Sequence, residues 1–295
     1  MKTILVVFLF FWTVNLYSQP KVESALSCSY EELTAPDFVK AVSKSSGVCL
    51  LTLGILEKHG PHLPLGTDIF ECRKVAFTAA EKEYCIVFPT YFAGQINEAR
   101  HQPGTIAYSP ELLWMMLQET CEELSRNGLK KIIIVNGHGG NNDFLRYFCM
   151  SQMHKTHDYT LLFFQPVKDK ETAIKIETLR QTVGGGHADE IETSMMRFIR
   201  PDLVKTELSG TQSGKDQMRL AELTSQYTGI WWYAQYPNHL AGDATKSSVE
   251  LGKLLVESDA GQLVQLIKKV KQSDKIETLQ NQFYQESEMP LRTKQ

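Results

Sequence analysis

The sequence predicts an α/β domain whose mainly parallel sheet is covered by helices on both faces. Three observations carry this prediction. Apolar runs of strand length alternate with segments of helical spacing. The runs are continuous rather than alternating, as in strands that are buried on both faces. Hydrophobic residues make up 42% of the 295 positions, and no repeat, Gly/Ser linker or low-complexity tract divides the chain.

The expected strands are short apolar runs bounded by turn residues or polar residues. The clearest of them is KIIIVN at residues 131–136. The others lie at residues 47–56, 84–89 and 159–165. In sheets of this kind, ligand sites lie at the carboxyl ends of the strands, so functional residues are expected just after these runs.

The expected helices are segments with apolar residues at helical spacing. They lie at residues 68–83, 110–126, 144–153, 188–199 and from 244 to about 270. The second has the best-defined start, because Ser109 can cap it and Pro110 suits the first helical position. The polar tail after Ser273 is expected to be loosely held.

Residues 1–18 have the layout of a secretory signal peptide, which leaves residues 19–295 as one domain. Lys2 precedes an apolar run at 4–14, and polar residues precede an expected cleavage site after Ser18. The run is too short to span a bilayer comfortably, which disfavours the alternative of a membrane anchor. We therefore expect export to the periplasm or the extracellular space.

The charge balance argues against several classes of partner. The formal net charge is −3, from 31 basic and 34 acidic residues, and no long basic block is present. Nucleic acid and anionic membrane surfaces are therefore not expected as partners. The six cysteines show no metal-type spacing, and four of them sit in apolar runs as small hydrophobes.

Three polar clusters follow the expected strands or open an expected helix. The first is EKHGPHLPLGTD at 57–68, where Glu57 and His59 point to the same side of an extended chain and a Pro/Gly loop can return Asp68 to them. The second is NGHGGNN at 136–142, and the third is GGGHADEIETS at 184–194. Each alone is compatible with an ordinary polar strand end or turn. Together they supply the histidines and carboxylates of a binuclear hydrolytic site.

These motifs, in this order, resemble the creatininase family of amidohydrolases: E-x-H-G-P-H-L-P-L-G-T-D, N-G-H-G-G-N and H-A-x-E-x-E-T-S. Shorter matches lie at 103–106, 201–204 and 242–244. The resemblance implies a three-layer α/β/α sandwich, commonly assembled as a homohexamer. It also implies two divalent metal ions per chain at the strand ends, as zinc or manganese, with iron as an alternative.

The resemblance also implies roles for single residues. Glu57, Asp68 and His138 would hold one metal, and His59 and Asp68 would hold the other. His187 would contact the substrate and move protons. Catalytic and further metal roles are expected for residues of the third cluster, with Glu190 orienting His187 or the metals and Glu192 serving as a ligand. Substrate contacts are expected from three positions, namely His101, Gly139 and Gly140.

The sequence departs from the creatinine-hydrolysing members at two positions. Gly140 stands where they carry a metal-binding Glu, and Val183 stands where they carry a Trp that packs on the substrate. Either Glu192 replaces the missing ligand, or the second metal is weakly held and Glu192 hydrogen-bonds a ligating histidine. Creatinine itself is not the expected substrate. Outside the motifs, Trp231 to Tyr233 are expected in the core, and His154 and His157 in solvent.

The predicted function is that of an exported, metal-dependent amidohydrolase that cleaves a non-peptide C–N bond in a small cyclic or linear amide. Metals would lower the pKa of a water, and His187 would protonate the leaving nitrogen. Two alternatives stay open. One is a metal-dependent hydrolase of another bond type. The other is a non-catalytic exported binding protein that keeps the fold, which the glycine at position 140 suggests.

Overall fold

The structure of the chain is a computed structural model that describes residues 25–223 and 225–293. The predicted signal peptide at 1–18 lies outside these residues. Among the helices of the described part, none combines the length and the apolar character that crossing a membrane would require.

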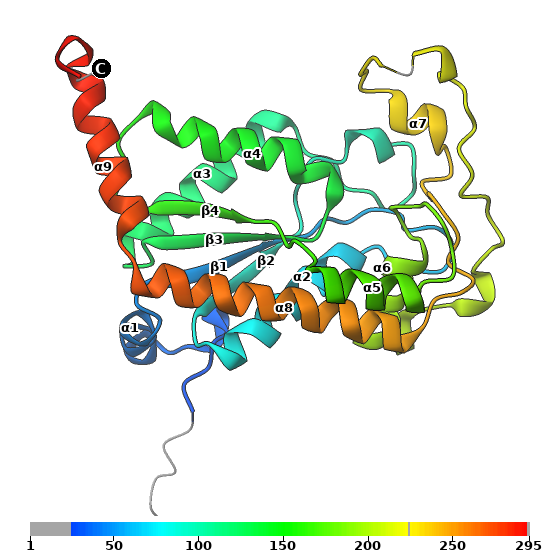
Figure 1. Cartoon of the computed structure of the whole chain (residues 1–295), viewed down its shortest axis with the longest axis horizontal. Helices are drawn as coiled ribbons and strands as arrows, with labels where there is room; N and C mark the ends of the chain where they lie inside the picture. Colours follow the sequence, from blue (N-terminus) through cyan, green and yellow to red (C-terminus); the bar gives the residue numbers. More distant parts are fainter. Residues whose placement is uncertain (1–24, 224, 294–295) are drawn as a thin grey trace, which may run out of the picture.

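The centre of the molecule is a four-stranded parallel sheet with the strand order β2-β1-β3-β4 (Figure 1). The strands are β1 Val48–Leu53, β2 Ile86–Tyr91, β3 Lys131–Asn136 and β4 Thr160–Phe164. All six residues of β1 are buried, as expected for a strand between two neighbours. The carboxyl ends of the four strands lie at one edge of the sheet, and that edge carries the site described below.

Helices cover both faces of the sheet, so the predicted α/β class and its three layers are confirmed. The helices are α1 Ala35–Lys44, α2 Thr67–Lys82, α3 Pro110–Arg126, α4 Asn142–Ser151, α5 Lys170–Leu179, α6 Glu190–Ile199, α7 Trp231–Gln235, α8 Val249–Gln272 and α9 Lys275–Glu288. One apolar core lies between the sheet and helices α2, α6 and α8. The other lies between the opposite face and α3, α4 and α1.

Several element boundaries differ from the sequence prediction. Helix α6 begins at Glu190 rather than Ala188, because Ala188 has a left-handed backbone with φ 53° and Asp189 caps the helix through the N–H groups of the first turn. Helix α8 begins at Val249, where the Ser248 side chain accepts from the N–H of the third residue. Helices α1, α5 and α7 were not predicted. The tail after Ser273 forms helix α9, which has no buried residue.

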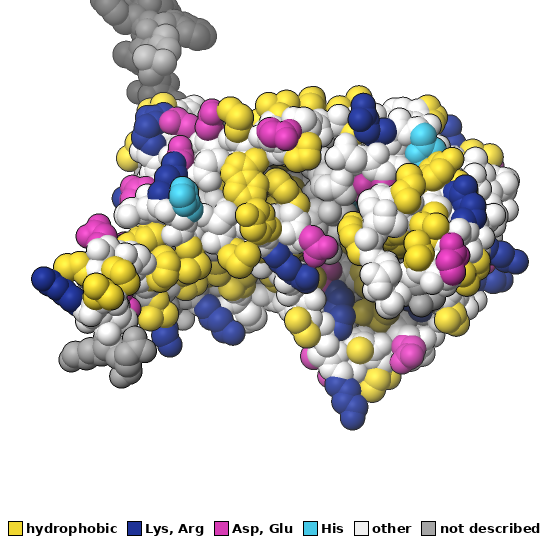
Figure 2. Space-filling view, turned by 90° about the horizontal axis from the view of Figure 1, so that it is seen from above, with side chains coloured by type: hydrophobic (Ala, Val, Ile, Leu, Met, Phe, Trp, Pro, Cys, Tyr) yellow, Lys and Arg dark blue, Asp and Glu magenta, His cyan; other side chains and the backbone are white. Residues whose placement is uncertain are grey.

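The outer face of α3 and α4 exposes several large apolar side chains. Seen from above, hydrophobic side chains gather over the middle of this face (Figure 2). The large exposed residues of these two helices are Leu112, Met115, Tyr147 and Met150. All six cysteines of the chain are unpaired in the structure.

Candidate active site

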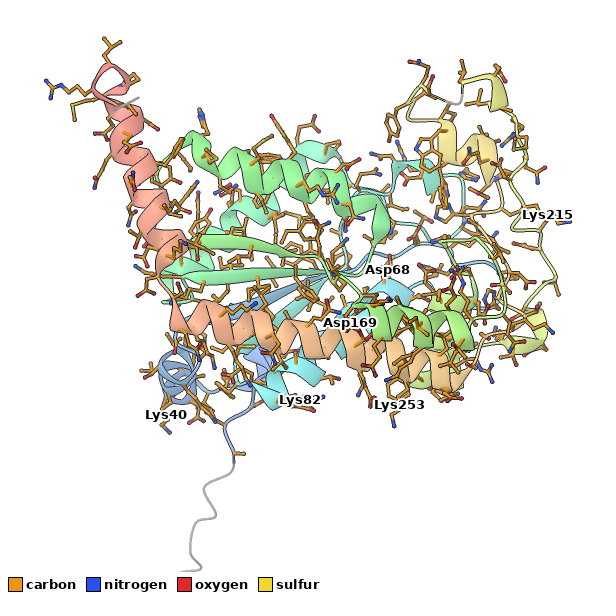
Figure 3. All side chains as sticks on the ribbon, viewed as in Figure 1. Lys40, Asp68, Lys82, Asp169, Lys215 and Lys253 are labelled. Atoms are coloured by element: carbon orange, nitrogen blue, oxygen red, sulfur yellow. The ribbon has the colours of Figure 1, made fainter. Side chains whose placement is uncertain are left out.

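The structure brings the five expected metal ligands together beyond the carboxyl ends of β1 and β3, where Figure 3 places Asp68. Their ligand atoms form two overlapping groups in which all atoms lie within 4.8 Å of one another. One group consists of Glu57, Asp68 and His138. The other consists of His59, Asp68 and Glu192. These are the two groups that the sequence predicted, with Asp68 common to both.

Two glycines allow Asp68 to reach this position. Asp68 lies in the first turn of α2, and this turn packs between the ends of two strands. A Cβ on Gly54 would lie 2.4 Å from the backbone N of Ile69, and a Cβ on Gly137 would lie 2.3 Å from the carbonyl O of Asp68. Only glycine permits so close an approach, so these positions set the distance between Asp68 and the strand ends.

The first group has the donor arrangement of a metal site. His138 Nδ1 lies 2.8 Å from Glu57 Oε1 and 3.2 Å from Asp68 Oδ2. Both oxygens are buried without a hydrogen-bond partner. His138 Nε2 lies 2.9 Å from the carbonyl O of Gln95 and donates to it, which leaves Nδ1 without a proton in the neutral ring. Metal–ligand bonds of about 2.0–2.2 Å place ligand atoms about 3 Å apart, so this set fits a divalent cation.

The second group is arranged in the same way around His59. Its Nδ1 lies 3.2 Å from the carbonyl O of Glu57 and donates to it, so Nε2 faces Asp68 Oδ1 at 2.9 Å and Glu192 Oε2 at 3.8 Å. Asp68 therefore presents Oδ1 to this group and Oδ2 to the first. Glu192 Oε2 also accepts from the N–H of Ala188, which holds the carboxylate toward His59.

In the absence of a metal ion, ionisable groups of the cluster hold protons that a cation would have to displace. Burial works against a charge on His59, but Asp68 and Glu57 raise its pKa to about 10. Burial likewise opposes a charge on His138, and the same two carboxylates still raise its pKa well above the usual range. Burial raises the pKa of Glu192 to about 8, even though His59 opposes this shift. Without a metal, protons therefore occupy the cluster at neutral pH.

His187 lies beside both groups, because one of its ring nitrogens lies within 4.8 Å of ligand atoms of Glu57 and His59, and we consider it for proton transfer. The ring is buried and its centroid lies 4.4 Å from that of His59. Nε2 donates to the carbonyl O of Lys58 at 2.9 Å, so Nδ1 is the free acceptor of the neutral ring. Burial lowers the pKa of His187 well below its usual value, although Glu57 opposes the shift. His187 is therefore neutral at physiological pH, with Nδ1 available as a hydrogen-bond acceptor.

Glu190 does not join the cluster, which corrects the expectation that it orients His187 or the metals. It is fully buried at the start of α6. Its carboxylate accepts from the backbone N–H of Gln181 at 2.9 Å and from that of Thr182 at 2.7 Å. The physical reason is helical geometry, since residues two apart on a helix face different directions. Glu192 points to His59 and Glu190 points to the preceding loop.

Sequence reasoning missed two buried residues of the site, His239 and Glu71. His239 Nε2 contacts Glu57 Oε2, and the Trp232 indole Nε1 donates to His239 Nδ1 at 2.9 Å. Its only sequence signal is its place just before the match at 242–244. Glu71 lies one turn after Asp68 on α2, and burial, reinforced by Glu192 and Asp68, raises its pKa well above the usual range. That helical spacing could have identified it.

A cavity of about 640 Å³ lies next to this cluster, with Gly140 in its lining. Its lining includes Gln95, Glu98, Arg100, His101, Gly140, Asp143, Phe144, Tyr227 and Trp231 to Tyr233. His101 and Gly140 line it as expected for substrate contacts, whereas Gly139 is not among the lining residues. A Cβ on Gly140 would lie 2.4 Å from His138 Nε2, so this glycine lies where the cavity meets the cluster. Trp231 to Tyr233 were expected in the core, and instead they form a wall of this cavity.

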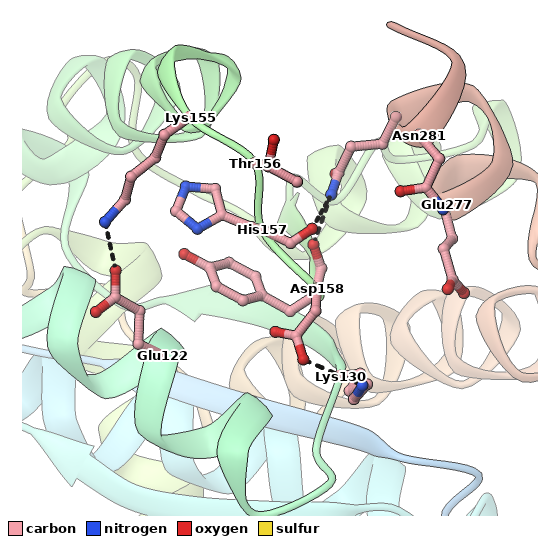
Figure 4. A pocket seen from close by; sticks show the side chains of 10 residues that line it. Glu122, Lys130, Lys155, Thr156, His157, Asp158, Glu277 and Asn281 are labelled. Carbon is pink, nitrogen blue, oxygen red and sulfur yellow. Dashed lines mark hydrogen bonds and ion pairs between the residues drawn. The ribbon is translucent and has the colours of Figure 1, made fainter. Parts of the chain in front are cut away.

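A second cavity, of about 630 Å³, lies at the opposite edge of the sheet, near the start of β4 (Figure 4). Lys155 pairs with Glu122 at 2.9 Å, and Lys130 pairs with Asp158 at 3.1 Å. His157, expected in solvent, is buried here against Tyr159, whereas His154 is exposed. The two lysines of this cavity are thus paired with carboxylates of the same cavity. The cavity that contains Gly140 therefore remains the candidate site.

Comparison with known proteins gives a consistent set of relatives. The family model described as "Creatininase: Creatinine amidohydrolase" matches residues 31–267. The chain is 26% identical over 193 residues to creatinine amidohydrolase of Pseudomonas putida, covering 59% of this chain and 72% of that protein. It is 24% identical over 247 residues to 3-dehydro-scyllo-inosose hydrolase of Thermotoga maritima, covering 77% and 78%. It is 30% identical over 164 residues to mycofactocin precursor peptide peptidase of Mycolicibacterium smegmatis, covering 54% and 60%.

Solved structures show the same fold. A crystal structure of creatinine amidohydrolase (creatininase) matches with a TM-score of 0.71 at 22% identity, covering 83% of this chain and 98% of that one. A structure described as "Creatininase Mn" matches with a TM-score of 0.71 at 21% identity, covering 82% and 98%. The relatives named above are all hydrolases, and their names refer to three different kinds of substrate.

Proposed function

The chain belongs to the creatininase family, and on this premise we propose that it is an exported, metal-dependent amidohydrolase of a C–N bond in a small molecule. The observation that carries the proposal is the pair of donor groups that share Asp68. Buried oxygens of Glu57 and Asp68 support it, because they make no hydrogen bond and both face His138 Nδ1, and such atoms are costly to bury unless a cation or a donor satisfies them. Neighbouring creatininase structures are described as manganese and zinc–zinc forms, which supports these ions as cofactors.

The residues divide into ligands and a proton carrier. Glu57, Asp68 and His138 would hold one ion, and His59, Asp68 and Glu192 the other. When bound, the ions supply Lewis-acid chemistry, which lowers the pKa of a water molecule and polarises a carbonyl group.

His187 performs the proton transfers in this proposal. Its Nδ1 takes a proton from the attacking water and delivers it to the leaving nitrogen, while its bond to the Lys58 carbonyl holds the ring in place.

The cavity supports a substrate other than creatinine. Its volume of about 640 Å³ lies within the range of ordinary small-molecule sites, about 300–1,000 Å³, and far exceeds one small flat ring. Val183, which stands where creatinine-hydrolysing members carry a stacking Trp, is fully exposed and contributes nothing to the lining. Aromatic residues of the α7 segment form the wall instead. A small amide with a bulkier, partly polar acyl or amine portion fits this site best.

Elemental analysis and turnover test the proposal. The purified protein should carry about two divalent ions per chain, and it should hydrolyse members of a panel of cyclic and linear amides. Chelation should abolish turnover, and Zn²⁺ or Mn²⁺ should restore it. Chelator-resistant activity would refute the metal mechanism. Full metal content without turnover of any amide would favour the binding protein or a hydrolase of another bond.

Export and self-association complete the proposal. Cleavage after Ser18, read by the N-terminal sequence of the secreted protein, tests the export step. The exposed apolar face of α3 and α4 supports a homo-oligomer, because contiguous apolar surface of this kind marks interfaces. Sedimentation analysis of the wild-type chain and of Met150→Glu tests it. A monomeric wild type would contradict the proposal.

A further inference from the structure

His239 has an unusual backbone conformation next to the cluster of candidate metal ligands. Its φ is 52°, in the left-handed region that side chains other than glycine rarely adopt. The side chain is nevertheless buried and hydrogen-bonded at both ring nitrogens. Strained conformations of this kind persist only where surrounding contacts hold them, and they gather at functional sites.

The two hydrogen bonds of His239 determine which of its ring nitrogens carries the proton. An indole N–H can only donate, so Trp232 Nε1 donates to His239 Nδ1 at 2.9 Å. Nδ1 is then the acceptor, and the ring proton must lie on Nε2. Nε2 therefore donates to Glu57 Oε2. The other oxygen, Oε1, has no hydrogen-bond partner and faces His138 Nδ1 at 2.8 Å.

We propose that His239 is a positioning residue that restricts Glu57 to a one-oxygen metal ligand, and that Trp232 holds His239 in the tautomer required for this. With Oε2 occupied by the imidazole, only Oε1 is available to the ion shared with Asp68 and His138. This inference deepens the proposed function and rests on it, since it presumes that the cluster binds metal.

The same contacts connect the substrate cavity with the metal ligand. Trp232 belongs to α7 and lines the cavity. Its ring also packs edge-on against His187, with centroids 5.9 Å apart and an interplanar angle of 85°. One aromatic side chain therefore contacts the cavity, the proton carrier and the residue that orients Glu57. The geometry assigns to α7 a role in metal binding as well as in forming the cavity wall.

His239→Gly is the decisive variant, because glycine adopts a positive φ without strain. The variant loses the bond to Glu57 without new backbone strain, but it also leaves a cavity and unpaired polar groups, so it should melt at a lower temperature than the wild type. Removing a group that hydrogen-bonds a metal ligand typically costs about 10–100-fold in affinity, and we expect that loss for one of the two ions. Competition with a chromophoric chelator measures the stepwise zinc affinities, and the visible spectrum of the Co²⁺-loaded protein reports the changed ligand geometry.

Three further variants separate positioning from packing. Trp232→Phe keeps the ring but removes the donor, and it should weaken the same ion by a smaller factor. Trp231→Phe is the matched control, because its wild-type indole lines the cavity but is not a partner of His239; metal affinity should not change. His239→Gln keeps a donor at the end of the side chain and should restore most of the affinity lost in His239→Gly.

The outcomes separate this inference from the proposed function. A wild-type chain that binds no metal refutes the proposed function. A metal-binding wild type together with unchanged affinities and an unchanged Co²⁺ spectrum in both His239→Gly and Trp232→Phe refutes the positioning role alone. If His239→Gly does not fold, Trp232→Phe and His239→Gln decide the question by themselves.

Discussion

Asp68 is the residue on which both donor groups depend. Its Oδ1 faces His59 at 2.9 Å and its Oδ2 faces His138 at 3.2 Å. Asp68→Ala should therefore lose both ions, whereas a change at Glu57 or His59 removes a ligand of one. Elemental analysis of the purified variant checks this. Asp202→Ala, an exposed acid paired with Arg200, is the control and should keep full metal content. Retention of both ions in Asp68→Ala would contradict the bridging role.

Glu192 and Glu190 form a matched pair on one helical turn. Glu192→Gln should lose most of the affinity for the ion bound by His59 and Asp68. The loss should exceed the factor of about 10–100 that is typical when a group that only supports a ligand is removed. Glu190→Gln should keep both ions, because its carboxylate contacts backbone N–H groups of the 181–182 loop. Zinc titration of the two variants compares them directly. Equal metal affinity in both would show that Glu192 is not a ligand.

His187→Ala should separate metal binding from catalysis. We assign the ring to proton transfer, so the variant should bind both ions but lose turnover by about 10²–10⁴-fold. The readouts are metal content and the rate of hydrolysis of whichever amide the wild type cleaves. A metal-free His187→Ala protein would instead identify His187 as a ligand, since its ring also lies near Glu57 and His59.

The single residues that the sequence identified lie shortly after a strand or in the first turn of a helix at the sheet's carboxyl edge. Glu57, His138 and Glu192 satisfy this condition. His239 does not, because it is 182 residues from Glu57 and reaches it only through a left-handed loop conformation. No spacing or periodicity encodes such a contact, so only the folded chain reveals it.

Among the elements, buried strands were predictable and lightly packed helices were not. The four strands are continuous apolar runs, which a parallel sheet between two helical layers requires. Helix α5 has no buried residue and α7 has only five residues, so neither leaves a clear apolar stripe. The predicted strand 47–56 ends early, at Leu53, because Gly54 lies against the first turn of α2.

Helix α9 is an element whose removal should leave the site intact. None of its residues is buried, and it is held by polar contacts such as Gln280 to the carbonyl O of Tyr159 at 2.9 Å and Tyr284 to that of Gln152 at 3.1 Å. Truncation after Ser273 should lower the free energy of unfolding by about 1–3 kcal/mol, since each bond contributes about 1 kcal/mol net. Urea titration measures this. A loss of bound metal on truncation would show an unexpected coupling to the site.

For the whole molecule, metal binding, proton release and stability are linked. In the metal-free chain, Asp68 and Glu57 outweigh burial and raise the pKa of His59 from 6.5 to about 10. The interactions of the protonated His59 ring stabilise the fold fully below pH 6.5, and this stabilisation is lost as the pH rises through about 10. Metal binding requires the neutral ring, so each displaced proton makes the apparent affinity rise about tenfold per pH unit in this window.

The two effects have opposite signs, which predicts how the melting temperature depends on pH. Between pH 6.5 and 9.5 the metal-free protein should become less stable, whereas the loaded protein should keep its stability, because the tighter binding of its ions offsets the lost contribution of the proton. The gap between their melting temperatures should therefore widen steadily with pH. Calorimetry of metal-free and zinc-loaded samples at fixed free zinc measures it, and His59→Gln should reduce the slope because it removes one of the protons that must be displaced. A gap in the wild type that narrows or stays constant with pH would show that His59 is not the site of proton release, and that the second ion is not held through its Nε2.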